Sequence, residues 1–289
     1  MKKRNLHKII VGLLILGGGF FIVHRYYTTS GTYSFKQITS FQEAQSELST
    51  CNKDTLIVFD IDDTLLRPVD AVVNFAQYPY LFRLNILLSH PFLFMSKKWE
   101  YYASIVWKNI DWQLMQDDIP ALIDTLKRQC TVIALTAIET GRFGIIENFI
   151  QWRKNLLKRF NINFDTQFGN AVFKTLPSYR ANYPELAEGV LYCNGISKGK
   201  VLGAFLDYAH LQPHTIIFFD DIEKNLISVE QMCKTRNICF IGFHYIRKKQ
   251  YITPWNGKRI LFQIDHLIKN NQWLSDKDAD SMISCLPAL

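Results

Sequence analysis

The sequence predicts an α/β protein in which a mostly parallel sheet is flanked by helices and interrupted by a helical cap insertion. Two observations predict the sheet. Short apolar runs rich in β-branched and aromatic residues alternate with amphipathic stretches, which is typical of parallel strands joined by crossover helices. Three of these runs also end in polar side chains, and the carboxyl ends of parallel strands form the edge where open α/β sheets bind ligands.

Four helix–strand pairs carry this alternation, and a further helix is expected near the end of the chain, around residues 259–274. The four expected helices are FQEAQSELS (41–49), PALIDTLKRQ (120–129), SKGKVLGAFLDYA (197–209) and EKNLISVEQMCKT (223–235). The strands expected after them, in the same order, are TLIVFD (55–60), TVIALTA (131–137), TIIFFDD (215–221) and ICFIGFHY (238–245). Pro120 suits the first turn of its helix, because the N–H that proline lacks has no partner there.

Two stretches interrupt the alternation. Residues 67–118 are long and strongly aromatic, and their place after the first strand favours a helical cap between two parts of a core, 55–66 and 119–289. Aromatic side chains dominate protein cores, so we expect most of them to pack inside the cap rather than to stack on a substrate. Residues 161–196 are irregular, which favours loops or a small hairpin. Residues 31–54 are expected to form a linker and the leading helix.

The N-terminal residues 1–30 have the composition of a membrane-targeting segment. Basic residues precede an uncharged apolar run from Ile9 to Val23, which as a helix would span roughly 22 Å of the ~30 Å hydrocarbon core. This pattern is typical of an uncleaved signal anchor or a cleaved signal peptide, and the bulky residues before Thr28 disfavour cleavage. A buried core helix is the third alternative. Because basic flanks stay in the cytoplasm, we expect either a bacterial inner-membrane protein with an extracytoplasmic body or a secreted protein.

Charge and cysteine content narrow the class of function. The formal net charge is +7, but five basic and no acidic residues fall within residues 1–30, so the remaining 28 basic and 26 acidic residues leave only +2. A nucleic-acid partner is therefore not expected. Six cysteines are scattered without a C-x-x-C pair, which disfavours a zinc site. Outside the cytoplasm one cysteine pair could oxidise, and the sequence does not indicate which pair. The sequence does not indicate an oligomeric state either.

The first expected strand, in IVFDIDDTLL (57–66), is followed at once by three carboxylates, Asp60, Asp62 and Asp63. Charges at the end of a buried strand are costly unless something neutralises or uses them. Two further strands end in polar groups in the same way, at Thr136 and at Asp220 with Asp221. Because parallel strands end at one edge, these side chains are expected to converge on one site, with Asp63 only shaping the turn.

These residues resemble, in order, the four motifs of the haloacid dehalogenase-like (HAD) superfamily. The matching residues are Asp60-Ile61-Asp62-Asp63-Thr64 for D-x-D-x-T, Thr136 for the second motif, Lys198 for the third-motif lysine, and Asp220-Asp221 with Asn225 for D-D-x-x-x-N. Lys200 is the alternative for the third motif because it lies in the same stretch, GISKGKVL. The resemblance spans residues 55–245 and implies a Rossmann-like parallel sheet with a cap after the first motif strand.

The resemblance also implies Mg²⁺-dependent chemistry, because a phosphate dianion repels a carboxylate nucleophile unless a divalent cation neutralises both. In the implied scheme Asp60 attacks phosphorus and forms an aspartyl-phosphate, while Asp62 acts as general acid and then general base. Thr136 and Lys198 would bind the phosphoryl oxygens. The implied metal ligands are the Asp60 carboxylate, the backbone carbonyl of Asp62 and the Asp220 carboxylate, with Asp221 and Asn225 in support.

An Asp at position 62 resembles the phosphatases and phosphomutases of the superfamily, and an extracytoplasmic body disfavours a mutase of central metabolism. The sequence therefore predicts a phosphatase, similar to poorly characterised secreted or membrane-anchored bacterial members. Its substrate is expected to be a phosphoprotein (phosphotyrosine) or a small phosphate ester. Two alternatives stay open: a membrane-tethered binding module without catalysis, and a phosphotransferase that uses the same Asp60.

Overall fold

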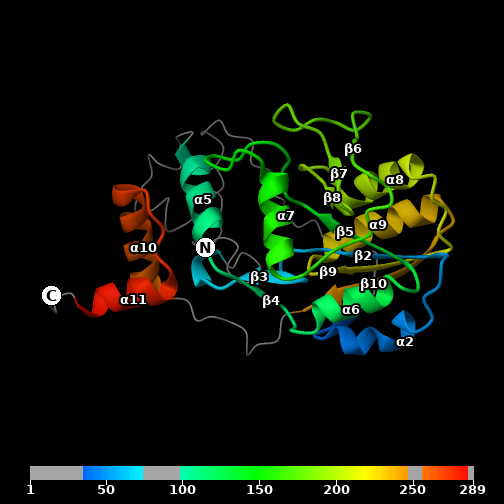
Figure 1. The fold of residues 1–289 in the computed structure, drawn as a ribbon, viewed down its shortest axis with the longest axis horizontal. Helices are drawn as coiled ribbons and strands as arrows, with labels where there is room; N and C mark the ends of the chain where they lie inside the picture. The colour runs from blue at the N-terminus through cyan, green and yellow to red at the C-terminus, as the bar shows by residue number, and fades with distance from the viewer. Residues whose placement is uncertain (1–34, 74–97, 247–255, 286–289) are drawn as a thin grey trace, which may run out of the picture.

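The computed structural model describes residues 35–73, 98–246 and 256–285, and an eight-stranded sheet forms the centre of this part (Figure 1). Its strands, in order across the sheet, are β1 (Lys36–Ile38), β10 (Cys239–Tyr245), β9 (Thr215–Asp220), β2 (Thr55–Phe59), β5 (Thr131–Thr136), β8 (Val190–Tyr192), β7 (Glu185–Ala187) and β6 (Ala171–Val172). From β1 to β8 all neighbours are parallel, whereas β7 and β6 are antiparallel. A separate antiparallel pair consists of β3 (Leu66–Pro68) and β4 (Trp112–Leu114).

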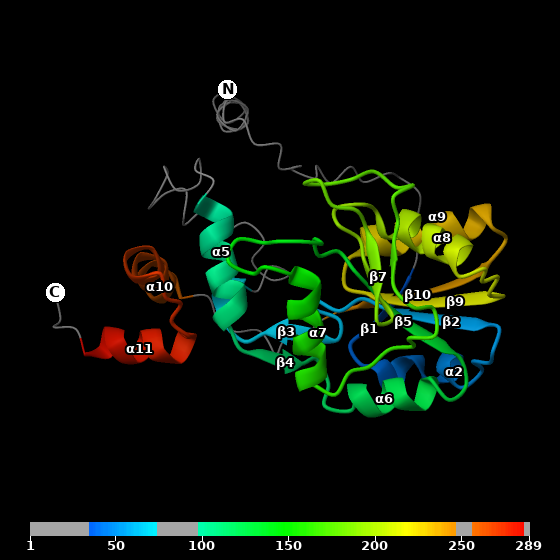
Figure 2. The same cartoon turned by 45° about the horizontal axis from the view of Figure 1, so that its top comes forward.

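Helices cover both faces of the parallel strands. α8 (Lys198–Tyr208) and α9 (Glu223–Thr235) lie on one face, and α2 (Gln45–Leu48) and α6 (Ile119–Leu126) lie on the other (Figure 2). The remaining helices of the described chain are η1 (Phe41–Ala44), η2 (Ala71–Val73), α5 (Lys98–Asn109), α7 (Phe149–Arg159), α10 (Gly257–Asn270) and α11 (Asp276–Ser284). The predicted α/β class, with a mostly parallel central sheet flanked by helices, is confirmed.

The alternation of side chains along the central strands fills a core layer on each face. In β2, Leu56 and Val58 join the cluster that includes apolar residues of α8 and α9, whereas Ile57 and Phe59 join the one that includes residues of α2 and α6. All five residues of β2 are buried. Because both faces of the strand are covered, its sequence is continuously apolar rather than alternating between apolar and polar.

Most elements predicted from the alternation are confirmed. α9 has the predicted bounds, and the other predicted strands and core helices differ only at their ends. The stretch 41–49 forms η1 followed directly by α2. α10 confirms the expected late helix, and α11 follows it without having been predicted. The stretch 161–196 contains the β7–β8 hairpin, whose second strand pairs with β5 and extends the central sheet.

Two further elements, β1 and α7, escaped prediction because their sequence pattern is weak or interrupted. β1 lies within the stretch predicted as a linker, where Ile38 alone is buried, and a strand of three residues offers too short an alternation to recognise. It pairs with β10 at the edge of the sheet. α7 has a buried arginine, Arg153, on its otherwise apolar face, which breaks the apolar period expected of a packed helix.

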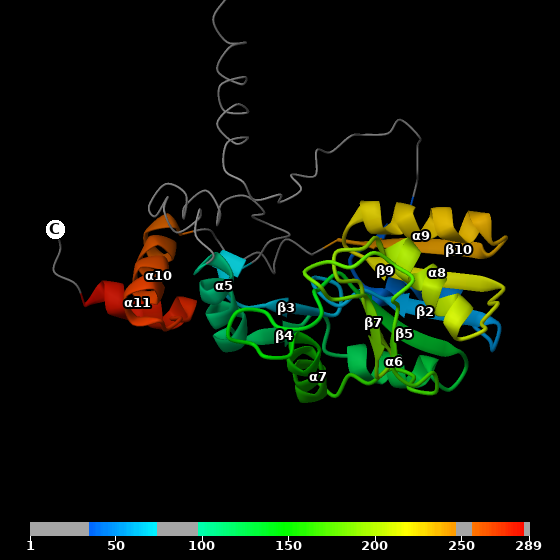
Figure 3. The same cartoon turned by 90° about the horizontal axis from the view of Figure 1, so that it is seen from above.

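The predicted cap is described only in part, because residues 74–97 lie outside the described residues. The predicted signal segment 1–30 also lies outside them. The described ends of the stretch 67–118 contain β-structure as well as helix: η2, α5 and the β3–β4 pair. α10 and α11 lie at the end of the molecule remote from the central sheet, beyond α5 (Figure 3). Among the described helices, none has both the length and the apolar composition needed to cross a membrane.

Candidate metal and phosphate site

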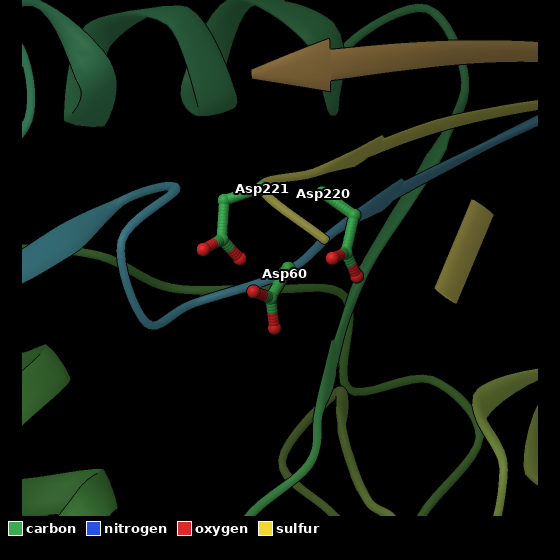
Figure 4. Close-up of side chains that lie close together, drawn as sticks. All are labelled: Asp60, Asp220 and Asp221. Carbon is green, nitrogen blue, oxygen red and sulfur yellow. The ribbon is translucent and has the colours of Figure 1, made fainter. Parts of the chain in front are cut away.

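The carboxyl ends of β2 and β9 bring three carboxylates together. Asp60 directly follows β2, and Asp220 and Asp221 lie at the end of β9. The backbone N–H of Asp60 donates to the carbonyl oxygen of Phe219 at 2.9 Å, so the two strand ends are held in register. One carboxylate oxygen from each of the three residues lies within 4.8 Å of the others (Figure 4). The predicted convergence of these side chains is confirmed.

A buried lysine bridges two of the three carboxylates. Lys198, the first residue of α8, places its Nζ 2.5 Å from Oδ1 of Asp60 and 2.7 Å from Oδ2 of Asp220. Burial alone lowers the pKa of Lys198, but the carboxylates of Asp220 and Asp60 outweigh it and raise that pKa well above its ordinary value. Lys200 is exposed, whereas Lys198 is buried against two of the acids, so the structure selects Lys198 from the two candidate lysines.

The crowded acids resist ionisation. Burial raises the pKa of Asp60 to about 7, an effect that Lys198 partly offsets and that the Asp220 and Asp62 carboxylates increase. Loss of hydration raises the pKa of Asp221 well above its ordinary value, and the carboxylates of Asp60 and Asp220 add to that rise. One lysine therefore does not balance three carboxylates, and the site favours a further positive charge or a proton.

The donor set fits a hard divalent cation. Asp60 and Asp220 have 4% and 0% of their surface exposed, and both present carboxylate oxygens, the ligands that Mg²⁺ prefers in proteins. Oδ1 of Asp220 accepts hydrogen bonds from the backbone N–H of Ile222 at 2.8 Å and from Nδ2 of Asn225 at 3.0 Å. These two donors fix the orientation of the Asp220 carboxylate, as supporting hydrogen bonds do at metal sites.

Between Asp60 and β3 the chain forms a tight turn that carries the second acid, Asp62. Asp63 has a left-handed backbone with φ of 59°, and its N–H donates to the carbonyl oxygen of Leu66 at 2.8 Å. This conformation is one that aspartate adopts more readily than most residues. The predicted turn-forming part of Asp63 is thereby confirmed. Thr64 closes the turn, with its hydroxyl 3.5 Å from Oδ2 of Asp60.

Asp62 lies at the outer side of the cluster and is held from two directions. The hydroxyl of Thr136, the last residue of β5, donates to Oδ2 of Asp62 at 3.2 Å. Nη2 of Arg153 lies 2.7 Å from Oδ1 of the same carboxylate. The side chain of Asp62 is 31% exposed, whereas that of Arg153 has no exposed surface. The Asp62 carboxylate can therefore face solvent or a ligand while Thr136 and Arg153 fix its position.

Arg153 is a site residue that the sequence reasoning missed. It lies on the buried face of α7, and its guanidinium carbon is 5.3 Å from the ring centre of Trp112 and 5.2 Å from that of Trp152. Such positions over aromatic faces favour a buried cation. A signal was present in the sequence: the helical period of Phe149, Ile150, Leu156 and Leu157 places Arg153 on their apolar face. A charge at such a position requires a buried partner.

The fold and the site together define an α/β protein with a buried carboxylate–lysine cluster at the carboxyl edge of a parallel sheet. Residues 37–280 match the model of the family described as "Protein of unknown function (DUF2608)". The match covers more than half of the chain, and the protein belongs to this family. The matched segment includes every site residue described above.

Similar proteins occur in Rickettsia and Chlamydia species. The chain is 25% identical to an uncharacterised protein of Rickettsia prowazekii over 97% of its length and 99% of that protein. It is 28% identical to an uncharacterised protein of Rickettsia felis, over 76% of this chain and 79% of that protein. A protein of Chlamydia pneumoniae, provisionally named an outer membrane protein, is 24% identical over 86% of this chain and 90% of its own length.

Proposed function

We propose that this protein is a Mg²⁺-dependent phosphomonoester hydrolase of the HAD type that acts through an aspartyl-phosphate on Asp60. The observation that carries the proposal is the arrangement of Asp60, Asp220 and Lys198. A lysine ammonium contacts both acids, and Asp221 completes a carboxylate set within 4.8 Å. Asp60 follows β2, Lys198 begins α8, and Asp220 and Asp221 lie at the end of β9, which is the order of the HAD motifs.

The residues divide the proposed reaction among them. Asp60 supplies the nucleophilic oxygen, and its attachment to β2 and β9 fixes the direction of attack. Lys198 stabilises the charge of the phosphoryl oxygens. Asp60, the Asp62 carbonyl and Asp220 would hold Mg²⁺, with Asp221 and Asn225 in support, and the bound cation would neutralise the phosphate and the nucleophile.

Asp62 is the proposed general acid and base. Its 31% exposed side chain can donate a proton to the leaving oxygen and later accept one from the hydrolytic water. Thr136 and Arg153 hold the two oxygens of its carboxylate, so the group keeps one orientation through both steps. The motif implies that Thr136 binds the phosphoryl group. Its hydrogen bond to Asp62 gives it a second proposed role, which is to orient the general acid.

The proposed substrate is a phosphotyrosine-containing protein or a small phosphate ester, and the stretch 67–118 is the proposed cap that selects between them. We further propose an extracytoplasmic location, either at a bacterial inner membrane or after secretion. The basic, then apolar composition of residues 1–30 supports this, as does the outer membrane name of the Chlamydia pneumoniae relative.

The test compares two acids of the same motif in the full-length protein purified in detergent. Hydrolysis of a phosphotyrosine peptide, nucleoside monophosphates and small esters is measured with Mg²⁺ and with a chelator. Asp60→Asn is expected to lower the rate on the order of 1000-fold or more, as removal of a nucleophile does. Asp63→Asn is the matched control, because asparagine also tolerates the left-handed backbone at this position, and it is expected to keep most activity.

Activity that survives Asp60→Asn or the chelator would contradict the mechanism. Absence of turnover in the wild type would favour a binding module without catalysis. The phosphotransferase alternative predicts a phosphorylated acceptor when an alcohol is added in excess, together with dependence on Asp60. Chromatography of the products distinguishes it from hydrolysis.

A further inference from the structure

Two cysteines lie at the amino ends of neighbouring parallel strands, on the edge of the sheet opposite the carboxylate cluster. Cys51 lies in the loop between α2 and β2, and Cys130 directly precedes β5. β2 and β5 are adjacent, with Leu56 opposite Thr131, so Cys130 is at the level of the start of β2. The topology therefore brings together two cysteines that are far apart in the sequence.

The two side chains contact each other and the same core layer. Their side chains interact with one another, and Cys51 packs against the apolar cluster that contains Cys130. The Cys51 thiol donates to the carbonyl oxygen of Glu47 at 3.6 Å, and the Cys130 thiol donates to that of Leu126 at 3.3 Å. Each residue is also held by its backbone: the N–H of Cys51 donates to Leu48 at 3.3 Å, and that of Cys130 donates to Leu126 at 3.0 Å. The ordered ends of α2 and α6 thus hold both cysteines at this edge of the sheet.

The two thiols differ in access and in acidity. Cys130 is 7% exposed, whereas Cys51 is half-buried and lines a pocket of about 210 Å³ together with Asn52 and His214. Interaction with the Cys130 thiol lowers the pKa of the Cys51 thiol, and the same interaction, with burial, raises the pKa of Cys130. A thiolate is the reactive form, so Cys51 is the thiol that an external reagent reaches first.

We propose that Cys51 and Cys130 form a redox-active pair that closes to a disulfide by exchange with an external disulfide, such as that of a thiol–disulfide oxidoreductase or glutathione disulfide. The Cys51 thiolate attacks one sulfur of the oxidant, forming a mixed disulfide and releasing the other sulfur as a thiolate. The Cys130 thiol loses its proton, and its sulfur attacks Cys51 in that mixed disulfide and releases the second sulfur of the oxidant. Two electrons pass to the oxidant, which leaves as two thiols.

The cross-link would act on stability rather than on the chemistry at the opposite edge. It would join the starts of β2 and β5, whose other ends lead to Asp60 and Thr136 across strands of 5 and 6 residues. Closing the long intervening loop constrains the unfolded chain, so the oxidised protein is expected to have a higher Tm, by on the order of 10 °C. Phosphatase activity, which rests on the separate proposal above, is expected to be the same in both forms.

The test uses the full-length wild-type protein equilibrated in glutathione buffers from fully reduced to fully oxidised. Free thiols are then trapped with a maleimide, and the digest is mapped by mass spectrometry without reduction. The expected result is one linked pair of peptides, containing Cys51 and Cys130, that appears cooperatively with oxidation. It should be accompanied by the rise in Tm and by no change in catalytic rate.

Variants separate this pair from other cysteines. Cys51→Ser and Cys130→Ser are each expected to abolish the linked peptides and the rise in Tm, whereas Cys239→Ser, at an exposed cysteine, keeps both. The wild-type titration does not depend on how well the variants fold. The proposal is overturned if Cys51 and Cys130 both remain fully alkylated in oxidised glutathione, or if a different pair links at the same potential.

Discussion

Nη2 of Arg153 lies 2.7 Å from Oδ1 of Asp62, and this ion pair joins a fully buried helix side chain to the motif turn after β2. The guanidinium lies over the rings of both Trp112 and Trp152, so its position is set by the packing of α7. A partly exposed acid on a turn thereby acquires a fixed orientation. We expect this relationship to control the proposed acid–base step more than substrate binding.

Replacing Arg153 should therefore lower kcat with little change in KM. Arg153→Met keeps much of the apolar volume but removes the partner of Asp62, and misplacement of a catalytic group by about 1 Å can cost roughly 100-fold in rate. We expect kcat to fall about 10- to 100-fold, with partial recovery in Arg153→Lys. Steady-state kinetics of the wild type, Arg153→Met and Arg153→Lys measure kcat and KM separately.

The neighbouring Lys154 provides the control for that experiment. Its Nζ pairs with Oε1 of Glu188, whose side chain is 55% exposed, and pairs at the surface contribute little. Lys154→Met should leave kcat nearly unchanged. An unchanged kcat in Arg153→Met would show that Asp62 does not depend on the buried guanidinium.

Lys198 should matter most when no metal is present. Lys198→Met leaves the carboxylates of Asp60 and Asp220 without their ammonium partner, and loss of one member of a buried ion pair costs about 3–5 kcal/mol. The Tm in a chelator should therefore fall by several degrees or more. Mg²⁺ should raise the Tm of the variant more than that of the wild type, because a cation then replaces the lost charge.

Lys200→Met is the matched control, since this lysine lies on the same helix and is exposed. Calorimetric scans with chelator and with Mg²⁺ compare the three proteins. Equal Tm values for Lys198→Met and Lys200→Met in the chelator would contradict a charge-balancing lysine. Failure of Mg²⁺ to restore stability would contradict the metal site.

Gly199 sets how closely α8 approaches α9, and so where Lys198 lies. A Cβ at Gly199 would lie 2.0 Å from the carbonyl oxygen of Ser228, which is backbone and cannot move aside cheaply. Gly199→Ala should separate the two helices, lower the Tm and reduce activity at least tenfold through the displaced lysine. Thermal melts and rate measurements on the same preparation test both effects.

Gly203, one turn later on α8, offers the comparison. A Cβ there would lie 3.3 Å from Cγ of Met232, a flexible side chain, and alanine favours helix by about 1 kcal/mol over glycine. Gly203→Ala should be nearly neutral or slightly stabilising. If both substitutions behaved alike, close approach at Gly199 would not be what positions Lys198.

Asp70 should make stability depend on pH in the opposite sense from a surface carboxylate in an ion pair. It is buried, and its oxygens accept from Nε1 of Trp273 at 2.8 Å and from the N–H of Asp276 at 3.0 Å. Burial raises the pKa of Asp70, those two donors offset part of the rise, and the carboxylates of Asp276 and Asp111 add to it. The folded chain thus holds this proton more tightly than the unfolded chain.

The sign follows from proton linkage. Between the ordinary pKa of an aspartate, about 4, and the raised value, the folded state binds more protons, so stability contributed by Asp70 is complete below about pH 4 and is lost as pH rises. Asp70→Asn carries the neutral form at every pH, so its Tm relative to wild type should increase from pH 4 to pH 7. The same melts on Asp124→Asn, at an exposed position, should show no such trend. If the Tm difference between Asp70→Asn and the wild type stayed constant from pH 4 to pH 7, a raised pKa of Asp70 would not contribute to the pH dependence of stability.

Much of the fold could be predicted from local patterns. The strands and core helices were predictable because strands buried on both faces have continuously apolar sequences, and the helices between them have an apolar face. β1 and α7 were not, since one has a single buried side chain and the other has a charge on its buried face. An element could be predicted where its buried apolar side chains recur with the period of a strand or of a helix.

The sequence by itself determined that Asp60, Thr136 and Asp220 would lie at one edge of the sheet, because each lies at the end of a parallel strand and such ends share one edge. Only the tertiary structure decided that Lys198 rather than Lys200 faces the acids, that Arg153 holds Asp62, and that Cys51 contacts Cys130. The physical reason is that these relationships depend on how helices are rotated and packed against the sheet. Neighbours along the chain fix the direction of a strand, but long-range packing fixes which side chains touch.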